Sequence, residues 1–456
     1  MIEKIINVQL FLLIIIVYSV VPLYSQNNDT LSYFLGKEIQ VNEPNSGGDL
    51  QCEPSVAINK NIIIVSWNDS YGGKINSKTG SAVGWAISYN NGQNFNFGGY
   101  LPKIDEKSVL RVDGVDSWLG TDSNGNFYLQ VLSWQDRSHY LFVYYMDGNN
   151  LGKWEKRYTV YSDKLIDKPS MNVTSTGQIN ISYTGNIDKK NEIYFIHSSN
   201  QGKSWQTPLK LSNSTNPVKT GSCVVSYNDK ILVGWVEGIA MNQNEIWFAY
   251  SLDNGFSFSK AKLLYKISKT FNIVNGYTIG ALKDKGGNAL FLLSTSVWIT
   301  YTLNNNQANF WLAYTEGTEN EGSRVILFKM DENFKQISGP FYVGNNSTDY
   351  ERIFPTMTSI RNLPAVFYYD RRNHPFTTLT DVYLSIKLEN DTFQDIKINS
   401  TPTDWSKLPG DPKFAPTQRN IGDYMTIASY DNKLATTWVG EKNGKARIYF
   451  RLIEFR

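Results

Sequence analysis

The sequence predicts an all-β protein, a β-propeller of four-stranded antiparallel blades. The 456 residues include 12 Trp, 28 Tyr, 23 Phe and 34 Gly. No long stretch is rich in the helix-forming residues Ala, Glu, Lys and Leu. A β-branched segment that ends on an aromatic residue, often with an acid close behind, also recurs along the chain. The copies are Val65–Asp69, Leu132–Asp136, Ile181–Thr184, Val233–Glu237, Val366–Asp370 and Thr436–Glu441.

Each copy lies in a unit of four short strands joined by turns. In the first unit, a strand over Glu53–Ile58 precedes the one that ends near Trp67, and a third follows over Gly84–Ser88. Such a sheet cannot bury both of its faces alone, whereas radially packed sheets cover one another. The first strands of seven units are expected to begin near Glu53, Asp116, Lys168, Gly221, Tyr277, Phe354 and Gly422.

The fifth unit is the least regular. It covers about residues 275–344, its second strand is placed near Leu290–Ser294, and Trp298 and Trp311 are assigned to an inserted hairpin. Seven blades are expected, with six as the alternative if this unit is not a blade. An isolated strand at Gly36–Val41 is expected to complete the last blade and close the ring, so a single propeller domain spans residues 36–456.

The first 25 residues are typical of a secretory signal peptide. A short start with Lys4 precedes the apolar stretch Val8–Leu23, and the small Ser25 suits cleavage; an uncleaved anchor is the alternative. Residues 26–35 are expected to form a disordered linker. The mature protein is expected to be secreted, periplasmic or at the cell surface, without a transmembrane span. Whether Cys52 and Cys223 pair in that oxidising setting stays open.

Charge and ligand spacing exclude several classes of function. The formal net charge is +2, from 44 basic and 42 acidic side chains, and no run of basic residues is present, so nucleic acid is not an expected partner. The two Cys and three His residues have no zinc-binding spacing, so no metal and no cofactor are expected. A monomer is expected.

Three turns between third and fourth strands share a pattern. In each, a Gly can take positive φ, an Asn or Asp can bond the backbone of the turn, and the last aromatic residue can pack beneath it. The turns are Ser88–Phe95, Ser198–Trp205 and Ser251–Phe258. Together they resemble the Asp-box (Ser-x-Asp-x-Gly-x-x-Trp) of the sialidase-like, or BNR-repeat, propeller superfamily, and the resemblance extends over roughly residues 36–456. Only Asp253 keeps the acid of the motif and only Trp205 keeps its Trp.

The resemblance implies what an active site of this family would contain: three Arg around a substrate carboxylate, a Tyr nucleophile beside a Glu that lowers its pKa, and an Asp as acid or base. In a propeller, the starts of first strands and the loops after second strands converge on one face. From these positions, the candidate catalytic residues are Tyr424, Glu53 and Asp69, and the candidate substrate-binding residues are Arg137, Arg352, Arg371, Asp116, Trp118, Asp370 and Asp423. The family's first Arg lies in an Arg-Ile-Pro motif where this chain has Cys52-Glu53-Pro54, so the assignments rest on predicted position alone.

The sequence therefore predicts an exported sialidase-like propeller that acts on or binds carbohydrate or a glycoconjugate. The specific version of this hypothesis is an exo-glycosidase of the sialidase type that acts on an acidic sugar. One alternative is a non-catalytic propeller that binds a glycan or a protein at the cell surface. A second is a polysaccharide lyase, for which His139 beside Asp136, Arg137 and Tyr140 is the cluster of suitable residues.

Overall fold

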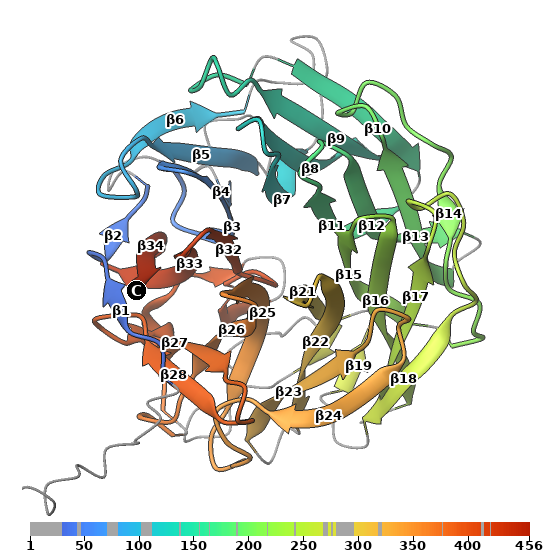
Figure 1. Cartoon of the computed structure of the whole chain (residues 1–456). Helices are drawn as coiled ribbons and strands as arrows, with labels where there is room; N and C mark the ends of the chain where they lie inside the picture. Colours follow the sequence, from blue (N-terminus) through green and yellow to red (C-terminus); the bar gives the residue numbers. More distant parts are fainter. Residues whose placement is uncertain are drawn as a thin grey trace, which may run out of the picture. The chain divides into compact units, whose positions relative to one another are not determined.

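The computed structural model describes most of the chain. The described residues are 30–42, 47–70, 81–101, 112–135, 138–154, 156–163, 165–187, 190–216, 218–240, 243–267, 272–274, 277–279, 296–317, 322–375, 377–411, 415–419 and 421–456. The expected signal peptide lies outside them. Residues 32–456 form one compact unit, in which seven four-stranded antiparallel sheets are arranged as a ring (Figure 1). This confirms the propeller fold that the resemblance implied, and the expected number of blades.

The blades follow one another along the chain, with the first strand of each nearest the centre of the ring (Figure 1). The first three blades consist of β3 (Gln51–Asn59), β4 (Ile62–Asp69), β5 (Ala82–Ser88) and β6 (Asn96–Tyr100); β7 (Val112–Thr121), β8 (Phe127–Gln135), β9 (Ser138–Met146) and β10 (Lys156–Asp163); and β11 (Ile166–Val173), β12 (Ile179–Ile187), β13 (Lys190–Ser198) and β14 (Leu209–Lys210). The fourth and sixth consist of β15 (Val218–Tyr227), β16 (Lys230–Ala240), β17 (Gln243–Ser251) and β18 (Lys262–Ile267); and β25 (Arg352–Ile360), β26 (Leu363–Asp370), β27 (Leu379–Lys387) and β28 (Phe393–Lys397).

The fifth blade differs from its expected position. It consists of β21 (Trp298–Asn304), β22 (Gln307–Gly317), β23 (Ser323–Met330) and β24 (Gln336–Tyr342). Trp298 therefore begins the first strand and Trp311 lies in the second, so their assignment to an inserted hairpin was wrong. The segment at Leu290–Ser294 lies outside the described residues. The short strands β19 (Asn272–Val274) and β20 (Tyr277–Ile279) pair with one another.

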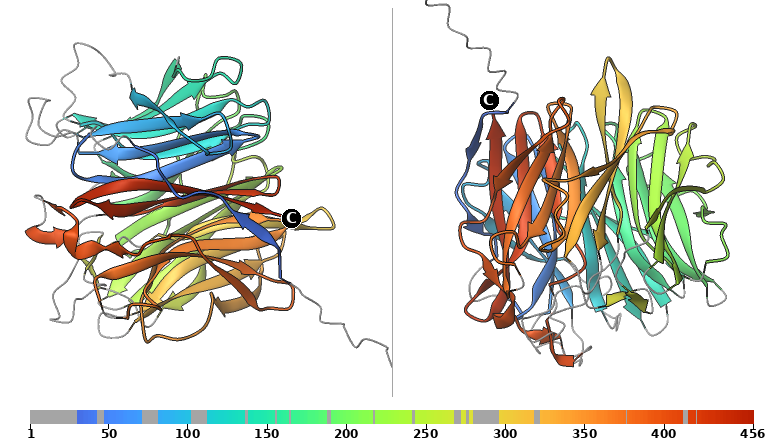
Figure 2. Two further views of the ribbon diagram at one scale, coloured as in Figure 1. Left: turned by 90° about the vertical axis from the view of Figure 1, so that its left-hand side faces the viewer. Right: turned by 90° about the horizontal axis from the view of Figure 1, so that it is seen from below.

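The start of the chain completes the seventh blade. This blade contains β32 (Thr426–Tyr430), β33 (Lys433–Lys442) and β34 (Lys445–Phe455), and both β1 (Tyr33–Leu35) and β2 (Ile39–Gln40) pair with β34. Figure 2 shows this blue segment alongside the red strands of the last blade. The expected ring closure is confirmed, and the pairing begins at Tyr33, ahead of the expected linker boundary.

Short elements connect the sixth and seventh blades, and they contain the one short helix seen in the described part of the chain. They are β29 (Thr403–Asp404), the 3-10 helix η1 (Trp405–Lys407), β30 (Gly410–Asp411) and β31 (Ala415–Arg419). Within the described segments, no helix has both the length and the apolar character needed to cross a bilayer.

The recurring aromatic residue of the second strands is buried wherever its side chain is described. Trp67, Trp235 and Trp438 are at most 1% exposed, and Tyr314 fills the same place in the fifth blade. Clusters of buried side chains join the first blade to the second, the second to the third and the third to the fourth. Burying each such large apolar side chain contributes about 1.5–3 kcal/mol, and two of the recurring aromatic residues, Tyr183 and Trp235, belong to the clusters between blades.

The three expected turns form one common arrangement. In each, the Ser hydroxyl accepts a hydrogen bond from the backbone N–H of the Gly, at 2.9 Å for Ser88 and Gly92 and 2.8 Å for Ser251 and Gly255. The final aromatic residue packs inward, as where the ring of Phe258 lies 4.7 Å from that of Phe195. Because strands alternate in direction, these turns lie on the face opposite the starts of the first strands.

Candidate functional site

The first strands of six blades begin with the same distortion. In five of the six, a residue with positive φ lies where a bulge interrupts the pairing of the first and second strands. In the sixth, the positive-φ residue Gly422 lies just before the first strand, β32. The residues are Glu53 (φ 53°), Asp116 (51°), Lys168 (47°), Gly221 (62°), Phe354 (50°) and Gly422 (82°). A bulge changes the direction of the side chains beside it. Residues from several blades therefore meet at the mouth of the channel.

A pair of carboxyl groups lies at this mouth. Glu53 of the first blade and Asp116 of the second hydrogen-bond to one another through their side chains. The backbone N–H of Asp423 donates to Oε1 of Glu53 at 3.0 Å, and the side-chain amide of Asn68 donates to Oε2. Burial, reinforced by nearby acids, raises the pKa of Glu53 well above its usual range and that of Asp116 to about 7. The two groups therefore share protons near neutral pH.

The close approach of these elements depends on Gly422. Its φ of +82° favours glycine. A Cβ added there would lie 2.4 Å from Cγ of Glu53. Gly422 therefore allows the segment before β32 to reach the carboxyl pair.

A lysine adds one positive charge to the site. The ammonium group of Lys168, whose side chain is 9% exposed, forms an ion pair with Asp423. The backbone N–H of Lys168 donates a hydrogen bond to Oδ1 of Asp167 at 3.0 Å. Burial raises the pKa of Asp167 as well. The positive charge of Lys168 is thus surrounded by acids, of which Asp423 neutralises it directly.

Aromatic rings form one wall of the site. The rings of Trp118 and Trp298 stack, with centroids 5.2 Å apart, and Tyr424 lies against Trp118 at 5.6 Å. The Tyr424 hydroxyl donates to the backbone oxygen of Ser117 at 3.0 Å. Burial and the neighbouring acids raise the pKa of Tyr424 well above its usual value. The sialidase-type role needs a lowered pKa, so the phenol in this setting stays protonated.

These groups enclose a small pocket. Its volume is about 20 Å³, which is room for one water-sized group. The hydroxyl of Ser222, a buried residue, has no hydrogen-bond partner in the described part of the protein. Besides Ser222, the lining residues include Glu53, Asp116, Trp118, Lys168, Cys223, Trp298, Asp423 and Tyr424. Five of the ten residues singled out from the sequence are thus brought together: Glu53, Asp116, Trp118, Asp423 and Tyr424.

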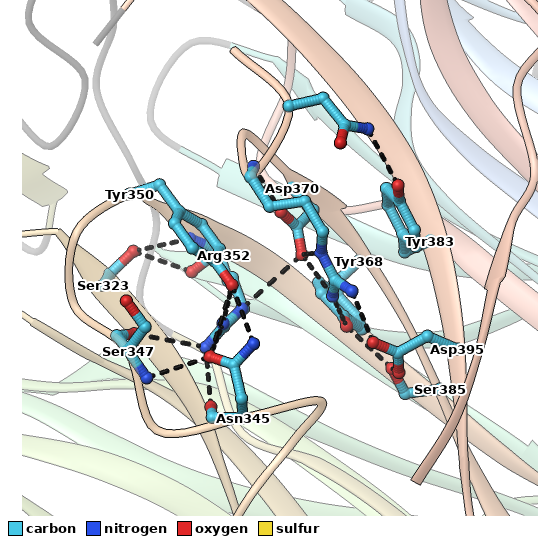
Figure 3. A network of polar contacts seen from close by, with 12 residues as sticks. Ser323, Asn345, Ser347, Tyr350, Arg352, Tyr368, Asp370, Tyr383, Ser385 and Asp395 are labelled. Carbon is cyan, nitrogen blue, oxygen red and sulfur yellow. Dashed lines mark hydrogen bonds and ion pairs between the residues drawn. The ribbon is translucent and has the colours of Figure 1, made fainter. Parts of the chain in front are cut away.

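Two of the expected substrate-binding residues instead belong to a polar network of the sixth blade and the segment that joins it to the fifth, drawn in Figure 3. Arg352 is fully buried; its Nε lies 3.5 Å from Oδ2 of Asp370, and its Nη1 donates to the backbone oxygen of Asn345 at 2.9 Å. Asp370 is also fully buried and pairs with Arg372, at 2.7 Å. Neither Arg352 nor Asp370 lines the pocket.

Arg371 and Asp69 are also held away from the pocket lining. Nη1 of Arg371 lies 2.9 Å from Oε1 of Glu351, and both side chains are almost completely buried. Asp69 accepts hydrogen bonds from the backbone N–H of Gly48 at 2.6 Å and from the side chain of Gln51 at 2.8 Å. These contacts fix the loop before β3, which gives Asp69 a structural role.

The remaining expectations concern a cluster around β9. Arg137 and Asp136 lie outside the described residues. His139 is described, and its Nδ1 lies 2.6 Å from the backbone oxygen of Ile166. His139 and Tyr140 do not line the pocket, so no described contact supports the lyase interpretation.

Three residues of the site, Lys168, Ser222 and Trp298, were not among the candidate site residues. Lys168 was expected at the start of a first strand, and Ser222 directly follows the positive-φ residue Gly221, so the repeated strand start was the signal for both. Trp298 was missed because the fifth blade was misplaced. Among the described residues, no group of three or more His, Cys, Asp and Glu is arranged to hold a metal ion, and Cys52 and Cys223 are buried free thiols.

No family model matches this sequence, and no curated protein sequence matches it. Solved structures do resemble it. A protein of unknown function from Dyadobacter fermentans is 11% identical over 93% of this chain and 99% of that chain, with a TM-score of 0.47. A sialidase from Trypanosoma rangeli, in complex with sialic acid, is 10% identical over 92% of this chain, which spans 58% of the sialidase, with a TM-score of 0.43. The GH93 α-L-arabinofuranosidase of Fusarium graminearum is 9% identical over 92% and 98% of the two chains, with a TM-score of 0.45. At such identities and scores, the functional reasoning rests on the pocket itself.

Proposed function

We propose that this chain is a carbohydrate-active propeller that binds a terminal sugar at the channel mouth, over Glu53 and Asp116. The observation that carries the proposal is the position of the carboxyl pair beside the stacked rings of Trp118 and Trp298. Sugar rings pack against aromatic rings, and their hydroxyl groups bond to carboxyl groups. The half-buried Trp118 and Asp116 leave part of this arrangement open to solvent.

The same pair gives the proposal its enzymatic version, an exo-glycosidase. Glycoside hydrolysis usually requires one carboxylic acid and one carboxylate. A group with a pKa of about 7, as for Asp116, can give and take a proton near neutral pH. Asp116 is therefore the candidate acid or base, rather than Tyr424, whose hydroxyl is bonded to a backbone oxygen. Glu53 hydrogen-bonds to Asp116 and so lies too close to it to act on the opposite side of a glycosidic bond, which makes Glu53 a positioning residue.

Export is part of the proposal and rests on the N-terminal sequence. The apolar stretch Val8–Leu23 and the small Ser25 support a cleavable signal. A glycan-binding protein that leaves the cytoplasm would meet its ligands outside the cell or in the periplasm.

The test is a binding screen on a glycan array, followed by turnover assays with chromogenic glycosides of neutral, amino and acidic sugars, including a sialoside. D116N and W118A are expected to reduce binding or turnover by tenfold or more. E389Q changes an exposed acid and L252A an exposed side chain on the opposite face, so both should behave as wild type.

Each outcome has a distinct meaning. Turnover that is lost in D116N supports the glycosidase, and binding without turnover supports the non-catalytic alternative. If the wild type neither binds nor cleaves any glycan, the proposal is wrong.

A further inference from the structure

We infer that the pocket receives the protonated amine of an amino sugar. The inference rests on the proposed function and names its ligand class. It follows from the charge, the size and the hydrogen-bonding groups of the pocket, taken in turn below.

The charge of the pocket is negative. Among the described lining residues, Glu53, Asp116 and Asp423 are acids and Lys168 is the base. The positive charge of Lys168 is neutralised by Asp423. The negative charge of the carboxyl pair, Glu53 and Asp116, therefore has no further cationic partner among the lining residues that the structure describes. When the pair keeps one shared proton it carries one negative charge, and a single cation complements it. An acidic sugar would instead bring a second negative charge into the site.

The size of the pocket fits the same group. A volume of about 20 Å³ holds one water-sized group and excludes a sugar ring. An ammonium group is close to water in size and donates three hydrogen bonds. The amine could therefore enter the pocket while its sugar ring stays at the mouth, beside the half-buried Trp118 and Tyr424.

One buried hydroxyl group in the pocket has no hydrogen-bond partner among the described residues. The Ser222 hydroxyl lies in a residue that is 5% exposed, and it has no hydrogen-bond partner among the described residues. Leaving a buried hydroxyl without a hydrogen-bond partner is unfavourable. An amine bonded to Ser222 and to the carboxyl pair would satisfy this oxygen as an acceptor.

The aromatic wall also favours a cation. Rings of Trp and Tyr attract cations through their electron-rich faces. Trp118, Trp298 and Tyr424 lie against one another at this wall. The same rings can carry the apolar face of a sugar, which an alkylamine or a peptide lysine lacks.

The experiment compares glucosamine, galactosamine and their short oligomers with the N-acetylated forms of the same sugars. These pairs differ in charge and keep the same ring. Isothermal titration of the wild type is expected to give at least fivefold tighter binding of the free amines. In buffers of different ionisation enthalpy at pH 6, amine binding should release protons, because a cation favours ionisation of the carboxyl pair over its protonated form. The other titratable groups that face the pair are Asp167, Asp423, Lys168 and Tyr424.

Two variants complete the test. D116N should abolish the preference for amines and the proton release, and E389Q should keep both. If neutral or acidic glycans bind and the amino sugars bind equally or more weakly, the inference is overturned and the proposed function stands. Equal binding of a lysine peptide would also overturn it, since the pocket would then select amines in general. The absence of any glycan binding would instead contradict the proposed function.

Discussion

Glu53 and Asp116, which start the first strands of neighbouring blades, hydrogen-bond to one another through their carboxyl groups at the mouth of the channel. Two ionised carboxylates at this separation repel each other, and burial adds to the cost of charging both. The native protein therefore holds protons at this pair that the unfolded chain releases at lower pH. Stability and ligand binding both depend on this relationship.

The first prediction concerns the pH dependence of stability. An unfolded Asp ionises near pH 3.9, whereas the native Asp116 has a pKa of about 7. Between these values the native state binds more protons, so the contribution of Asp116 is fully present below pH 4 and is lost as pH rises through 7. The wild type loses this contribution as pH rises, and D116N does not. The difference in free energy of unfolding, D116N minus wild type, should therefore increase by about 1–4 kcal/mol from pH 4 to pH 8, because one unit of pKa corresponds to about 1.4 kcal/mol. Urea unfolding at several pH values measures it, and a constant difference between the two proteins would contradict the shared proton.

The second prediction separates a structural arginine from a substrate-binding one. R352A leaves Asp370 buried with one cationic partner fewer, so the free energy of unfolding should fall by about 3–5 kcal/mol. K335A, which changes an exposed side chain, should stay within about 0.5 kcal/mol of wild type. Denaturant unfolding checks both values. If R352A keeps the stability of the wild type but loses glycan binding, Arg352 contributes to ligand binding and not to stability.

The third prediction concerns the turn at Gly255. Gly255 and Gly99 have φ values of 88° and 91°, but an added Cβ meets Phe195 at 2.8 Å only at Gly255 and meets nothing within 4 Å at Gly99. G99A should therefore cost the backbone strain alone, about 1–3 kcal/mol, and G255A a further 1–3 kcal/mol for the clash. Equal losses of stability in the two variants would show that the turn does not pack as described. Because Gly255 lies in a turn opposite the pocket and Gly99 lies in the outer strand β6, ligand affinity should be unchanged in both variants.

The fourth prediction tests the closure of the ring. A chain that starts at residue 42 lacks β1 and β2, which leaves the outer edge of β34 unpaired and removes the buried side chain of Val41. Its free energy of unfolding should be lower by about 2 kcal/mol or more, from lost apolar burial alone. A chain that starts at residue 30 keeps both strands and serves as the control. Identical thermal unfolding of the two chains would exclude a role of the first strands in closure.

The sequence was sufficient to predict the ring because one buried aromatic position recurs in the second strands. The fifth blade was misplaced although its copy, Leu312-Ala313-Tyr314-Thr315-Glu316, has the same order of Leu, aromatic residue and acid as Leu132–Asp136. Tyr314 is 1% exposed, like the aromatic residues of the other second strands, so the error lay in assuming evenly spaced units, which placed the second strand near Leu290–Ser294.

The site was predictable only in part. The starts of the first strands placed Glu53, Asp116, Trp118, Asp423 and Tyr424 correctly at one mouth. Arg352, at the start of a first strand, and Arg371, in a loop after a second strand, were assigned wrongly, because an Arg that binds a substrate and an Arg that pairs with a buried acid have the same local sequence. Arg352 and Arg371 are distinguished by Asp370 and Glu351, and such partners are visible only once the chain is folded.

The most direct measurement is a crystal structure of the protein with the tightest ligand from the glycan array. The account predicts a sugar at the channel mouth, beside Trp118, with a polar group within hydrogen-bond distance of the Ser222 hydroxyl and of the Glu53 and Asp116 carboxyl groups. A ligand bound on the outer strands or on the opposite face, with this pocket unchanged, would contradict it.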